Sequence, residues 1–403
     1  MPTSLAQPAS VIPRAPDGAT RPEFTDEEIK LIREGADGLM GTMPARFYYD
    51  EALYQWEVEH ILKRRWLYVG AWDWAEKPGD YFTLTMFGEP LVITRDEKGQ
   101  LHALVNVCRH RWSQVVPDGR GNKHVLVCPY HRWSYNLDGS LRGVSVEDIP
   151  GLQRSRCALP QVRVEEWNGL VFINFDPDAT PLAEELRDLD EIIRPYGLAT
   201  FRSAGITTYE SDWNYKFSFE TGYEAYHHAG IHAERILESM PPASHAPMAF
   251  GKTWGIYAYT APPEMMIPEF IHPYGPPPWM SDEQLASPER AAIFVGIYPN
   301  FISFLQPHQI STITTQHVSA ARNISSTTIA MADWALRRPG AAEQVAGDIQ
   351  FMKDVQDEDT FACRALQHGV RSSFNDRAIL HPRFEGQMTH YFNWFLDQFL
   401  GAA

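Results

Sequence analysis

Short runs of β-branched and aromatic residues fill the chain from residue 67 to residue 175, and Gly, Asp and Pro separate them. The clearest runs lie at residues 81–85, 90–94, 101–106 and 170–174. Runs of this length and composition, bounded by turn residues, are typical of β-strands. The pattern therefore predicts a small all-β domain over residues 67–175.

Helical patterns lie on either side of this region. Thr25 followed by Glu28 has the spacing of a capping box, which predicts a short helix in an otherwise loose N-terminal tail. Asp50 is expected to begin a second helix that runs to Trp66. Beyond residue 175 the patterns predict helices over 182–196, 213–232, 340–368 and 387–400, with several strands between residues 251 and 332. This second region is expected to be an α+β domain.

The expected parts of the chain are a disordered tail and linker at 1–40, a helix at 41–66 that packs on the second domain, the all-β domain at 67–175 and the α+β domain at 176–403. Residues 261–290 interrupt the strands with many prolines. An irregular segment of that length is uncommon inside a compact domain and often acts as a lid or a binding loop. We expect either a lid over a binding channel, or a surface loop or subunit contact.

Length and composition predict the number of domains and the class of ligand. The chain has 403 residues, of which 44% are hydrophobic and 12% aromatic, enough to fill the cores of two or more domains. Its net charge of -16 argues against a nucleic-acid or anionic-membrane partner, so we expect a small-molecule ligand. No stretch of about 18 apolar residues could span a membrane, and the N-terminus lacks a secretory signal pattern. With only four cysteines, the chain is expected in the cytoplasm.

Two pairs of cysteine and histidine residues lie in the all-β region: Cys108 with His110 and, seventeen residues later, Cys128 with His131. They can hold either tetrahedral zinc or a [2Fe–2S] cluster in which two histidines replace two cysteines on one iron. The single residue between Cys108 and His110 is tight for a zinc site and favours the cluster. Neutral imidazoles put less negative charge on their iron than thiolates do, so such a cluster accepts an electron more readily.

A second candidate site contains His227, His228 and His232. Non-heme iron that activates O2 is commonly held by two histidines and one carboxylate on one face, which leaves other positions open. On a helix, His228 and His232 share a face, whereas His227 and His232 lie about 140° apart. Helical periodicity alone therefore favours His228 with His232.

Several motifs resemble those of Rieske non-heme iron oxygenases of the ring-hydroxylating type, over about residues 45 to 400. They are Cys-Pro-Tyr-His at 128–131, the following residues 133–141, and the spacing of Glu224, His227 and His232. The resemblance implies a catalytic alpha subunit, with an all-β Rieske [2Fe–2S] domain and a catalytic domain of the helix-grip (SRPBCC/START-like) type. Such a protein belongs to the α+β class.

The resemblance also assigns metal ligands. It implies that the [2Fe–2S] cluster is held by Cys108, His110, Cys128 and His131, and a mononuclear Fe(II) by His227, His232 and Asp359. Asp359 lies in a late segment, 356–369, that resembles the family's Glu-Asp followed by Gln-x-Gly, and its rivals are Asp357 and Glu358. Gly230 could supply the break that lets the two ligand histidines converge, which leaves His228 a supporting or packing role.

Glu224 is expected to be a catalytic residue. In the family, the acidic residue at this position bridges an iron-ligand histidine to a Rieske histidine of a neighbouring subunit. The resemblance therefore implies a homotrimer in which electrons cross between subunits. A ferredoxin and an NAD(P)H-dependent reductase would supply them, since the sequence carries no dinucleotide or flavin fingerprint.

Two positions beside the cluster motifs depart from the family pattern. Trp112 and Arg132 stand where the family mostly has a small residue. Between residues 108 and 142, six Arg or Lys residues accompany only two aspartates. A basic rim of this kind is expected to steer an acidic ferredoxin.

The expected reaction is O2- and NAD(P)H-dependent monooxygenation of a small organic substrate, by hydroxylation or by N- or O-dealkylation. Glu224 and the late Glu-Asp segment imply it, because they resemble enzymes built from alpha subunits only. Dihydroxylation of an aromatic ring to a cis-diol is the alternative, and a Rieske electron carrier is the alternative from another class. The side chains expected to line the substrate pocket, most of which could equally be core, are Phe219, Tyr223, Ile231, Leu237, Phe294, Phe301 and Phe304.

Overall fold

The computed structural model describes residues 21–36, 39–259, 292–375 and 377–401. They form two compact units, one of Leu62–Leu182 and the other of the described parts of Ala15–Ile61 and Ala183–Ala403. The lid or loop expected at residues 261–290 lies outside the described residues.

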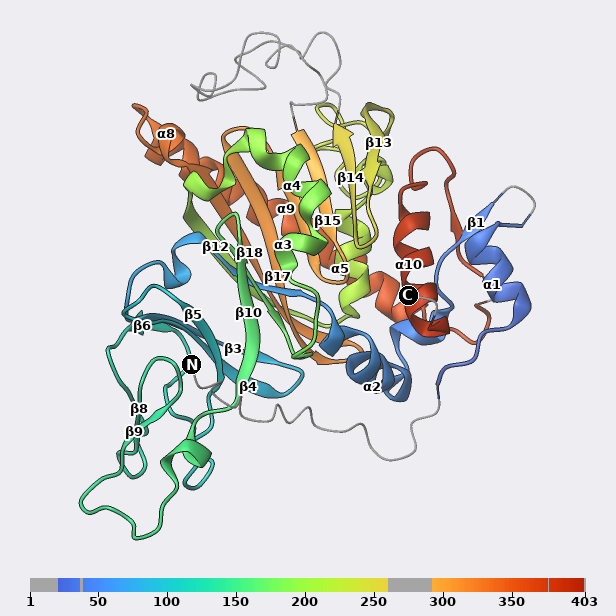
Figure 1. Cartoon of the computed structure of the whole chain (residues 1–403). Coiled ribbons are helices and arrows are strands. Elements are labelled where there is room, and N and C mark those ends of the chain that lie inside the picture. Colours follow the sequence, from blue (N-terminus) through green and yellow to red (C-terminus); the bar gives the residue numbers. More distant parts are fainter. Residues whose placement is uncertain (1–20, 37–38, 260–291, 376, 402–403) are drawn as a thin grey trace. The chain divides into compact units, whose positions relative to one another are not determined.

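The unit Leu62–Leu182 is built on antiparallel β-sheets (Figure 1). A seven-stranded sheet has the order β2-β11-β10-β5-β4-β3-β6, and a three-stranded sheet has the order β7-β8-β9. The strands are β2 (Leu67–Ala71), β3 (Asp80–Met86), β4 (Glu89–Arg95), β5 (Leu101–Val105), β6 (Arg120–Asn122), β7 (Leu126–Val127), β8 (Ser134–Tyr135), β9 (Leu141–Gly143), β10 (Gln161–Trp167) and β11 (Leu170–Asn174). Short 3-10 helices lie at η2 (Leu62–Arg64), η3 (Trp72–Ala75) and η4 (Arg154–Cys157).

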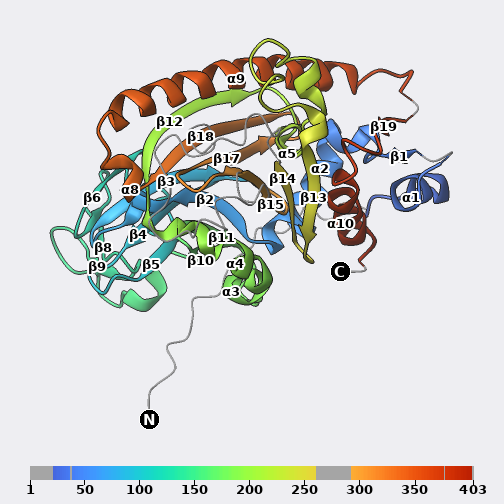
Figure 2. The same cartoon turned by 90° about the horizontal axis from the view of Figure 1, so that it is seen from above.

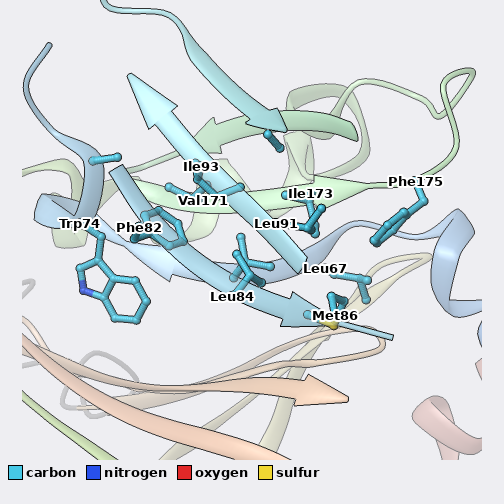
Figure 3. Close-up of a cluster of buried hydrophobic side chains, with 13 residues drawn as sticks. Leu67, Trp74, Phe82, Leu84, Met86, Leu91, Ile93, Val171, Ile173 and Phe175 are labelled. Atoms are coloured by element: carbon cyan, nitrogen blue, oxygen red, sulfur yellow. The ribbon is translucent and has the colours of Figure 1, made fainter. Parts of the chain in front are cut away.

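Alternating side chains of these strands form a hydrophobic core (Figure 3). In β3, Phe82, Leu84 and Met86 are buried in this core, while Thr83 and Thr85 are more exposed. Successive side chains of a strand point to opposite faces, so the alternation decides which face of β3 is buried. Burying each of these large side chains stabilises the unit by about 1.5–3 kcal/mol.

A second cluster of buried side chains surrounds the cysteine loops. Cys108 and Cys128 pack there with Leu104, Trp133 and Tyr135. The two loops are therefore anchored in a hydrophobic core, which holds their cysteines in place.

The other unit contains a seven-stranded antiparallel sheet of the order β12-β18-β17-β16-β15-β14-β13. Its strands are β12 (Phe201–Ser211), β13 (His245–Phe250), β14 (Trp254–Tyr259), β15 (Ala292–Ile297), β16 (Phe301–Leu305), β17 (Gln309–Ser319) and β18 (Arg322–Ala332). A separate two-stranded sheet pairs β1 (Met40–Gly41) with β19 (Ile379–Leu380).

Among the described residues, the α-helices are α1 (Asp26–Arg33), α2 (Glu51–His60), α3 (Leu182–Glu185), α4 (Arg187–Ile193), α5 (Tyr215–Gly222), α8 (Asp333–Leu336), α9 (Ala341–Gly369) and α10 (Met388–Leu400). The remaining 3-10 helices are η1 (Ala45–Tyr48), η5 (Arg194–Tyr196), η6 (Leu198–Thr200), η7 (Tyr226–Ala229) and η8 (Pro242–Ser244).

Helices α5 and α9 cover one face of the seven-stranded sheet β12–β18, and we call it the inner face. Figure 2 shows α9 running along β12. A Cβ atom on Gly205 of β12 would collide with Ile349 of α9, and a Cβ atom on Gly296 of β15 would collide with Phe219 of α5. Glycine at these two positions lets the helices approach the sheet backbone closely.

A buried ion pair joins α2 to α5. Lys216 Nζ lies 2.6 Å from Glu57 Oε2, and both side chains are almost fully buried. The Tyr215 hydroxyl donates to the other Glu57 oxygen. Buried charges persist only when they are paired and hydrogen-bonded, so this network specifies how α2 packs on α5.

Three expected helices are shorter than the sequence patterns indicated. The helix expected from Asp50 to Trp66 ends at His60, and the short 3-10 helix η2 follows it. The helix expected over 213–232 ends at Gly222, because the Glu224 carboxylate binds the backbone N–H groups of Tyr226 and His227 and starts a new turn there. The helix expected over 182–196 divides into α3, α4 and η5.

The tail and linker expected at residues 1–40 contains an ordered helix. Thr25 and Glu28 form both bonds of a capping box at the start of α1. Arg33, at the other end of α1, donates to Asn393 and pairs with Asp397 on α10. Packing on α10 therefore holds a helix that is too short to be stable alone. Among the described residues, no helix has the length and apolar character needed to cross a lipid bilayer.

Candidate metal centres

Cys108 and Cys128 begin two loops of the same design. The Cys108 backbone N–H donates to the Ser113 carbonyl at 2.8 Å, and the Trp112 N–H donates to the Cys108 carbonyl at 3.0 Å. The Cys128 loop repeats both bonds at equivalent positions and the same lengths. Each loop therefore closes on its own cysteine, as two related metal-binding loops would.

Both loops contain a residue in the left-handed backbone region. Trp112 has φ 57° and Arg132 has φ 60°. Glycine adopts this conformation without a steric penalty, whereas other residues rarely do. The two departures from the family pattern therefore fall at the strained position of each loop, and the Trp112 side chain is 84% exposed there.

The four predicted cluster residues meet as two pairs. The Cys108 and Cys128 thiols are buried. The ring centroids of His110 and His131 lie 4.6 Å apart, and His110 also stacks on Trp133. In a Rieske cluster one iron takes two thiolates and the other takes two imidazoles. The separation into a thiol pair and an imidazole pair fits that cluster.

The polar atoms around these side chains also fit a cluster. Burial raises the pKa of the Cys108 thiol. Burial also acts to raise the pKa of the Cys128 thiol, but hydrogen bonds from the Tyr130 and His131 backbone and from the Cys108 side chain lower it. The Tyr135 hydroxyl lies 3.2 Å from Cys108 Sγ. His131 Nδ1 is buried and has no hydrogen-bond partner among the described residues. Donors near the sulfurs and an unpaired imidazole nitrogen suit thiolate and histidine ligation.

The second constellation forms a compact cluster in the unit with α5 and α9. Ligand atoms of His227, His232 and Asp359 all lie within 4.8 Å of one another. His227 lies on η7, His232 in the turns that follow, and Asp359 on α9. Two imidazoles and one carboxylate on one side of a site match the ligand set of O2-activating non-heme iron.

Glu224 links the backbone to one of these histidines. One oxygen of its carboxylate accepts from the backbone N–H groups of Tyr226 and His227 at the start of η7. The other oxygen binds Nδ1 of the His227 ring. Glu224 therefore orients His227 so that Nε2 faces Asp359, 3.9 Å from its Oδ1.

Glu358 does the same for His232. Its Oε2 lies 2.6 Å from His232 Nδ1, and Arg235 binds the other carboxylate oxygen at 3.1 Å. His232 Nε2 lies 3.0 Å from Asp359 Oδ1. Of the three rival acidic residues, Asp359 is thus the one that shares the cluster with both histidines. Glu358 lies on the far side of the His232 ring, and Asp357 is exposed.

His228 lies beside this cluster, but one of its ring nitrogens is bound to a backbone carbonyl outside it. Its Nδ1 binds the Met240 carbonyl at 2.8 Å, and burial lowers its pKa to about 3. The helical argument that favoured His228 with His232 was wrong, because no continuous helix connects them. Residues 226–229 form η7, and residues 230–239 form turns.

Some of the predicted pocket residues lie close together and others lie apart. Phe294 and Phe304 are partly buried side chains of one cluster with Met240, Tyr259 and Ala292. Phe301 lies on the opposite face of β16 from Phe304, because neighbouring strand residues alternate.

Of the other four predicted pocket residues, Phe219 and Tyr223 pack next to this cluster, because the Tyr223 ring lies 5.3 Å from the Tyr257 ring, which stacks on Phe294. Phe219 stacks on Tyr391 in the core, at 4.2 Å between ring centroids, and Tyr223 is fully buried beside it. Ile231 lines an open cavity of about 550 Å³ with Arg235, Phe361 and acidic residues of α9. Leu237 is half-buried in the turns 230–239.

Sequence reasoning missed three side chains near the cluster. His245, Tyr257 and Tyr259 lie on β13 and β14, and the His245 ring is 5.7 Å from the His228 ring. No spacing rule connects His245 to the other histidines. It lies opposite Tyr259 in the β13–β14 pair, and His228 binds the carbonyl of Met240, five residues before His245. A histidine beginning a strand would have been the only signal.

Together, a pair of loops with two cysteines and two histidines and a separate cluster of two histidines and one carboxylate define a Rieske non-heme iron protein. Residues 65–154 match the Rieske [2Fe-2S] domain family, and residues 198–401 match the family described as ring hydroxylating alpha subunit (catalytic domain). The chain belongs to the ring-hydroxylating oxygenase alpha-subunit family. It is a terminal oxygenase component, with a [2Fe–2S] cluster and a mononuclear Fe(II) as cofactors. The predicted family, fold class and cofactors are confirmed.

Relatives include enzymes of both reaction types. The biphenyl 2,3-dioxygenase alpha subunit of Rhodococcus jostii (strain RHA1) is 31% identical over 326 residues, which is 74% of this chain and 70% of the relative. The glycine betaine monooxygenase oxygenase subunit of Pseudomonas aeruginosa (strain UCBPP-PA14) is 31% identical over 195 residues, covering 48% and 46%.

A solved structure supports the fold. It is a quaternary ammonium Rieske monooxygenase, whose structure gave insights into carnitine oxidation by gut microbiota and inter-subunit electron transfer. It superposes with a TM-score of 0.77 at 21% identity, covering 94% of this chain and 100% of that chain.

Proposed function

We propose that this oxygenase holds its two metal centres with the following residues: Cys108, His110, Cys128 and His131 for the [2Fe–2S] cluster, and His227, His232 and Asp359 for the Fe(II). The orientation of the two imidazoles carries the iron proposal. Carboxylates occupy the Nδ1 side of both rings, so both Nε2 atoms are directed to Asp359. Metal-ligating histidines characteristically pair their other ring nitrogen in this way.

When bound, the cluster supplies single electrons and the ferrous ion supplies open coordination positions for O2. The chain's own side chains prepare the second site. Glu224 and Glu358 keep a proton on Nδ1 of their histidines and leave Nε2 unprotonated for the metal. Asp359 adds the negative charge that makes the ligand set suit a divalent ion.

For the reaction we propose monooxygenation of a small organic substrate, by hydroxylation or by N- or O-dealkylation. The resemblance of Glu224 and of the segment 356–369 to alpha-only enzymes supports it, as does the similarity to glycine betaine monooxygenase. Aromatic cis-dihydroxylation is the second candidate, because the biphenyl dioxygenase relative matches a larger share of the chain.

Alpha subunits of this family act with a ferredoxin or reductase and an organic substrate. We propose further that the chain forms a homotrimer in the cytoplasm and receives electrons from a ferredoxin and an NAD(P)H-dependent reductase. Glu224 would connect His227 to His110 or His131 of a neighbouring copy. The exposed position of His110 supports such a contact.

The metal assignment is tested by analysis of iron and acid-labile sulfide in the purified protein. We expect about three irons per chain, two in the cluster and one mononuclear. His227→Ala should lose one iron, while the neighbouring His228→Ala should keep all of them. Two irons per chain, unaffected by His227→Ala, would favour an electron carrier, and zinc in a colourless protein would overturn the cluster.

The reaction type is tested with 18O2, NADH, a ferredoxin and its reductase, and a panel of anilides, methylammonium compounds and arenes. One labelled oxygen in a hydroxylated product, or release of formaldehyde or acetaldehyde together with a dealkylated product, supports monooxygenation. Two labelled oxygens in an arene product would establish dihydroxylation instead.

A further inference from the structure

A row of aromatic side chains lies on the inner face of the sheet. Tyr257, Phe294 and Phe304 are cross-strand partners on β14, β15 and β16, so they project from the same face. The Tyr257 and Phe294 rings stack with centroids 4.4 Å apart, and Phe304 follows at 4.7 Å from Phe294. Phe294 and Phe304 are only partly buried, so the row leaves ring surface accessible.

His245 ends this row at the first residue of β13. The centroid distances from its ring are 5.6 Å to Phe294, 5.7 Å to Tyr257 and 5.3 Å to Tyr259. One other ring, that of His228, separates it from the proposed iron ligand His227, at 5.7 Å from His245 and 4.6 Å from His227. The end of the aromatic row at His245 therefore lies beside the candidate iron site.

One ring nitrogen of His245 has a partner and the other has none. Nδ1 lies 3.2 Å from the Pro241 carbonyl oxygen, which can only accept, so Nδ1 carries a hydrogen. Nε2 is buried and has no hydrogen-bond partner among the described residues. Buried polar atoms are normally paired, so this nitrogen calls for a partner that is not part of the described chain.

The protonation of His245 decides what that partner must be. Burial lowers the pKa of His245 to about 4, so the ring is neutral at pH 7. With its one hydrogen on Nδ1, the neutral ring carries a lone pair on Nε2. Nε2 can therefore accept a hydrogen bond but cannot donate one.

The hydroxyl groups of the two tyrosines in ring contact with His245 already have acceptors. The Tyr259 hydroxyl donates to the Ser239 carbonyl, and the Tyr257 hydroxyl donates to the Gly222 carbonyl at 3.5 Å. The two tyrosines therefore present their rings, as the phenylalanines do. Among the described residues, the side chains in ring contact with His245 are those of His228, Tyr257, Tyr259 and Phe294, and these carry no negative charge.

We propose that His245 Nε2 accepts a hydrogen bond from the substrate, which is therefore an uncharged, largely apolar or aromatic molecule with an N–H or O–H donor, such as a secondary anilide or a phenol. This inference rests on the proposed function, because it places the substrate beside the proposed iron ligands. A tetraalkylammonium ion has no N–H or O–H donor to offer Nε2, so its preferential binding is the contrary outcome.

Matched ligands test the proposal directly. Binding to the anaerobic holoenzyme is measured by equilibrium dialysis for a secondary anilide and its N-methyl analogue, and for a phenol and its methyl ether. We expect the donor-bearing member of each pair to bind about tenfold more tightly, as one hydrogen bond to an otherwise unpaired site implies. Equal binding within both pairs, or tighter binding of a tetraalkylammonium ion, would overturn it.

Variants locate the effect at His245. His245→Phe keeps an aromatic ring but has no acceptor, so the ratio within each pair should fall to about one. His245→Gln can still accept and should retain part of the preference. The ratio is measured within one protein, so a general loss of folding does not mimic the effect, whereas a ratio unchanged in His245→Phe would contradict the assignment.

Turnover assays distinguish a failure of this inference from a failure of the proposed function. If no tested compound supports O2 uptake and no mononuclear iron is found, the proposed function fails. If the enzyme oxidises substrates but treats both members of each pair alike, only the assignment of His245 fails.

Discussion

Each proposed iron-ligand histidine has its Nδ1 held by a carboxylate, and the two carboxylates come from different elements. Glu224 precedes η7 and also caps it, whereas Glu358 lies on α9 next to the proposed ligand Asp359. A carboxylate on Nδ1 makes the opposite nitrogen a better ligand and stops the ring from rotating. The residue before the ligand on α9 is therefore expected to matter almost as much as the ligand.

Removing the Glu358 carboxylate should weaken iron binding. Glu358→Ala leaves His232 free to rotate or to change tautomer, and we expect the affinity for Fe(II) to fall about 10–100-fold. Competition with a chelator of known affinity measures the loss. Asp357→Asn, at the exposed neighbouring position, is the matched control and should bind iron as the original chain does. Unchanged affinity in Glu358→Ala would show that the contact does not position His232.

A different residue-scale effect is expected at the strained loop positions. Arg132 at φ 60° stands where the left-handed backbone costs a non-glycine residue about 1–2 kcal/mol. Part of that cost is recovered in Arg132→Gly, which should stabilise the holoenzyme by about 0.5–1 kcal/mol. Thermal unfolding measures the change.

Arg109→Gly, in the other cluster loop but outside the left-handed region, serves as the control and should give no gain. A lower melting temperature for Arg132→Gly than for the original chain would contradict the strain at this position.

At the scale of elements, α5 depends on partners far away in the sequence. Asn214 caps α5 through the Lys216 N–H, and its own backbone N–H donates to Gln367 of α9 at 2.6 Å. On the same helix, Glu220 is held by the Tyr48 hydroxyl of η1 at 2.8 Å. Polar groups buried between α5, α9 and η1 therefore define how these elements pack.

Glu220 should make the stability of this packing depend on pH. Burial raises its pKa from an ordinary 4.5 to about 8, against the effects of Tyr48 and Lys216. Between these values the unfolded chain releases a proton that the folded chain keeps, so stability falls as pH rises from about 4.5 to about 8. Glu220→Gln removes this loss, so the fall in unfolding free energy between pH 6 and pH 8 should be smaller in the variant by about 1–3 kcal/mol.

Chemical denaturation at several pH values gives these profiles. Glu234→Gln, at an exposed position in the turns 230–239, should leave the original slope in place. The same slope in Glu220→Gln and in the original chain would show that Glu220 is ionised when folded.

At the scale of the whole molecule, each compact unit carries one of the two candidate metal centres. The cysteine loops belong to Leu62–Leu182, whereas His227, His232 and Asp359 belong to the unit that contains α9. One centre that stores electrons is useful to the other only if the two approach each other. The proposed homotrimer meets that requirement by placing one copy's cluster beside its neighbour's iron site.

Mixed oligomers test this arrangement. A chain carrying His110→Ala, with a defective cluster, and a chain carrying His227→Ala, with no mononuclear iron, are each expected to be inactive. Co-expressed with different tags and purified as mixed oligomers, they should regain part of the activity, because an intact cluster can face an intact iron site in the next copy. Mixing the separately purified variants without subunit exchange is the control. Mixed oligomers as inactive as either parent would indicate transfer within one chain.

Local pattern was enough to predict much of this protein. Strand runs in the all-β region needed only alternating apolar residues and turn residues, and they reappear as β3, β4, β5 and β11. The cysteine and histidine spacing was readable for the same reason, since each cluster loop closes within six residues through its own backbone bonds. Such features depend on contacts between residues that are close together in the sequence, so a local sequence pattern is enough to predict them.

Tertiary structure alone decided the rest. Helical periodicity favoured His228 over His227, because the sequence pattern does not show that α5 ends at Gly222 or that the Met240 carbonyl binds His228. The division of labour between Glu358 and Asp359, adjacent on one helix, follows from which side of the His232 ring each one reaches. The contact between the His245 and His228 rings likewise joins residues that no spacing rule connects. Contacts between residues far apart in the chain depend on the packing of whole elements, and no local pattern encodes that packing.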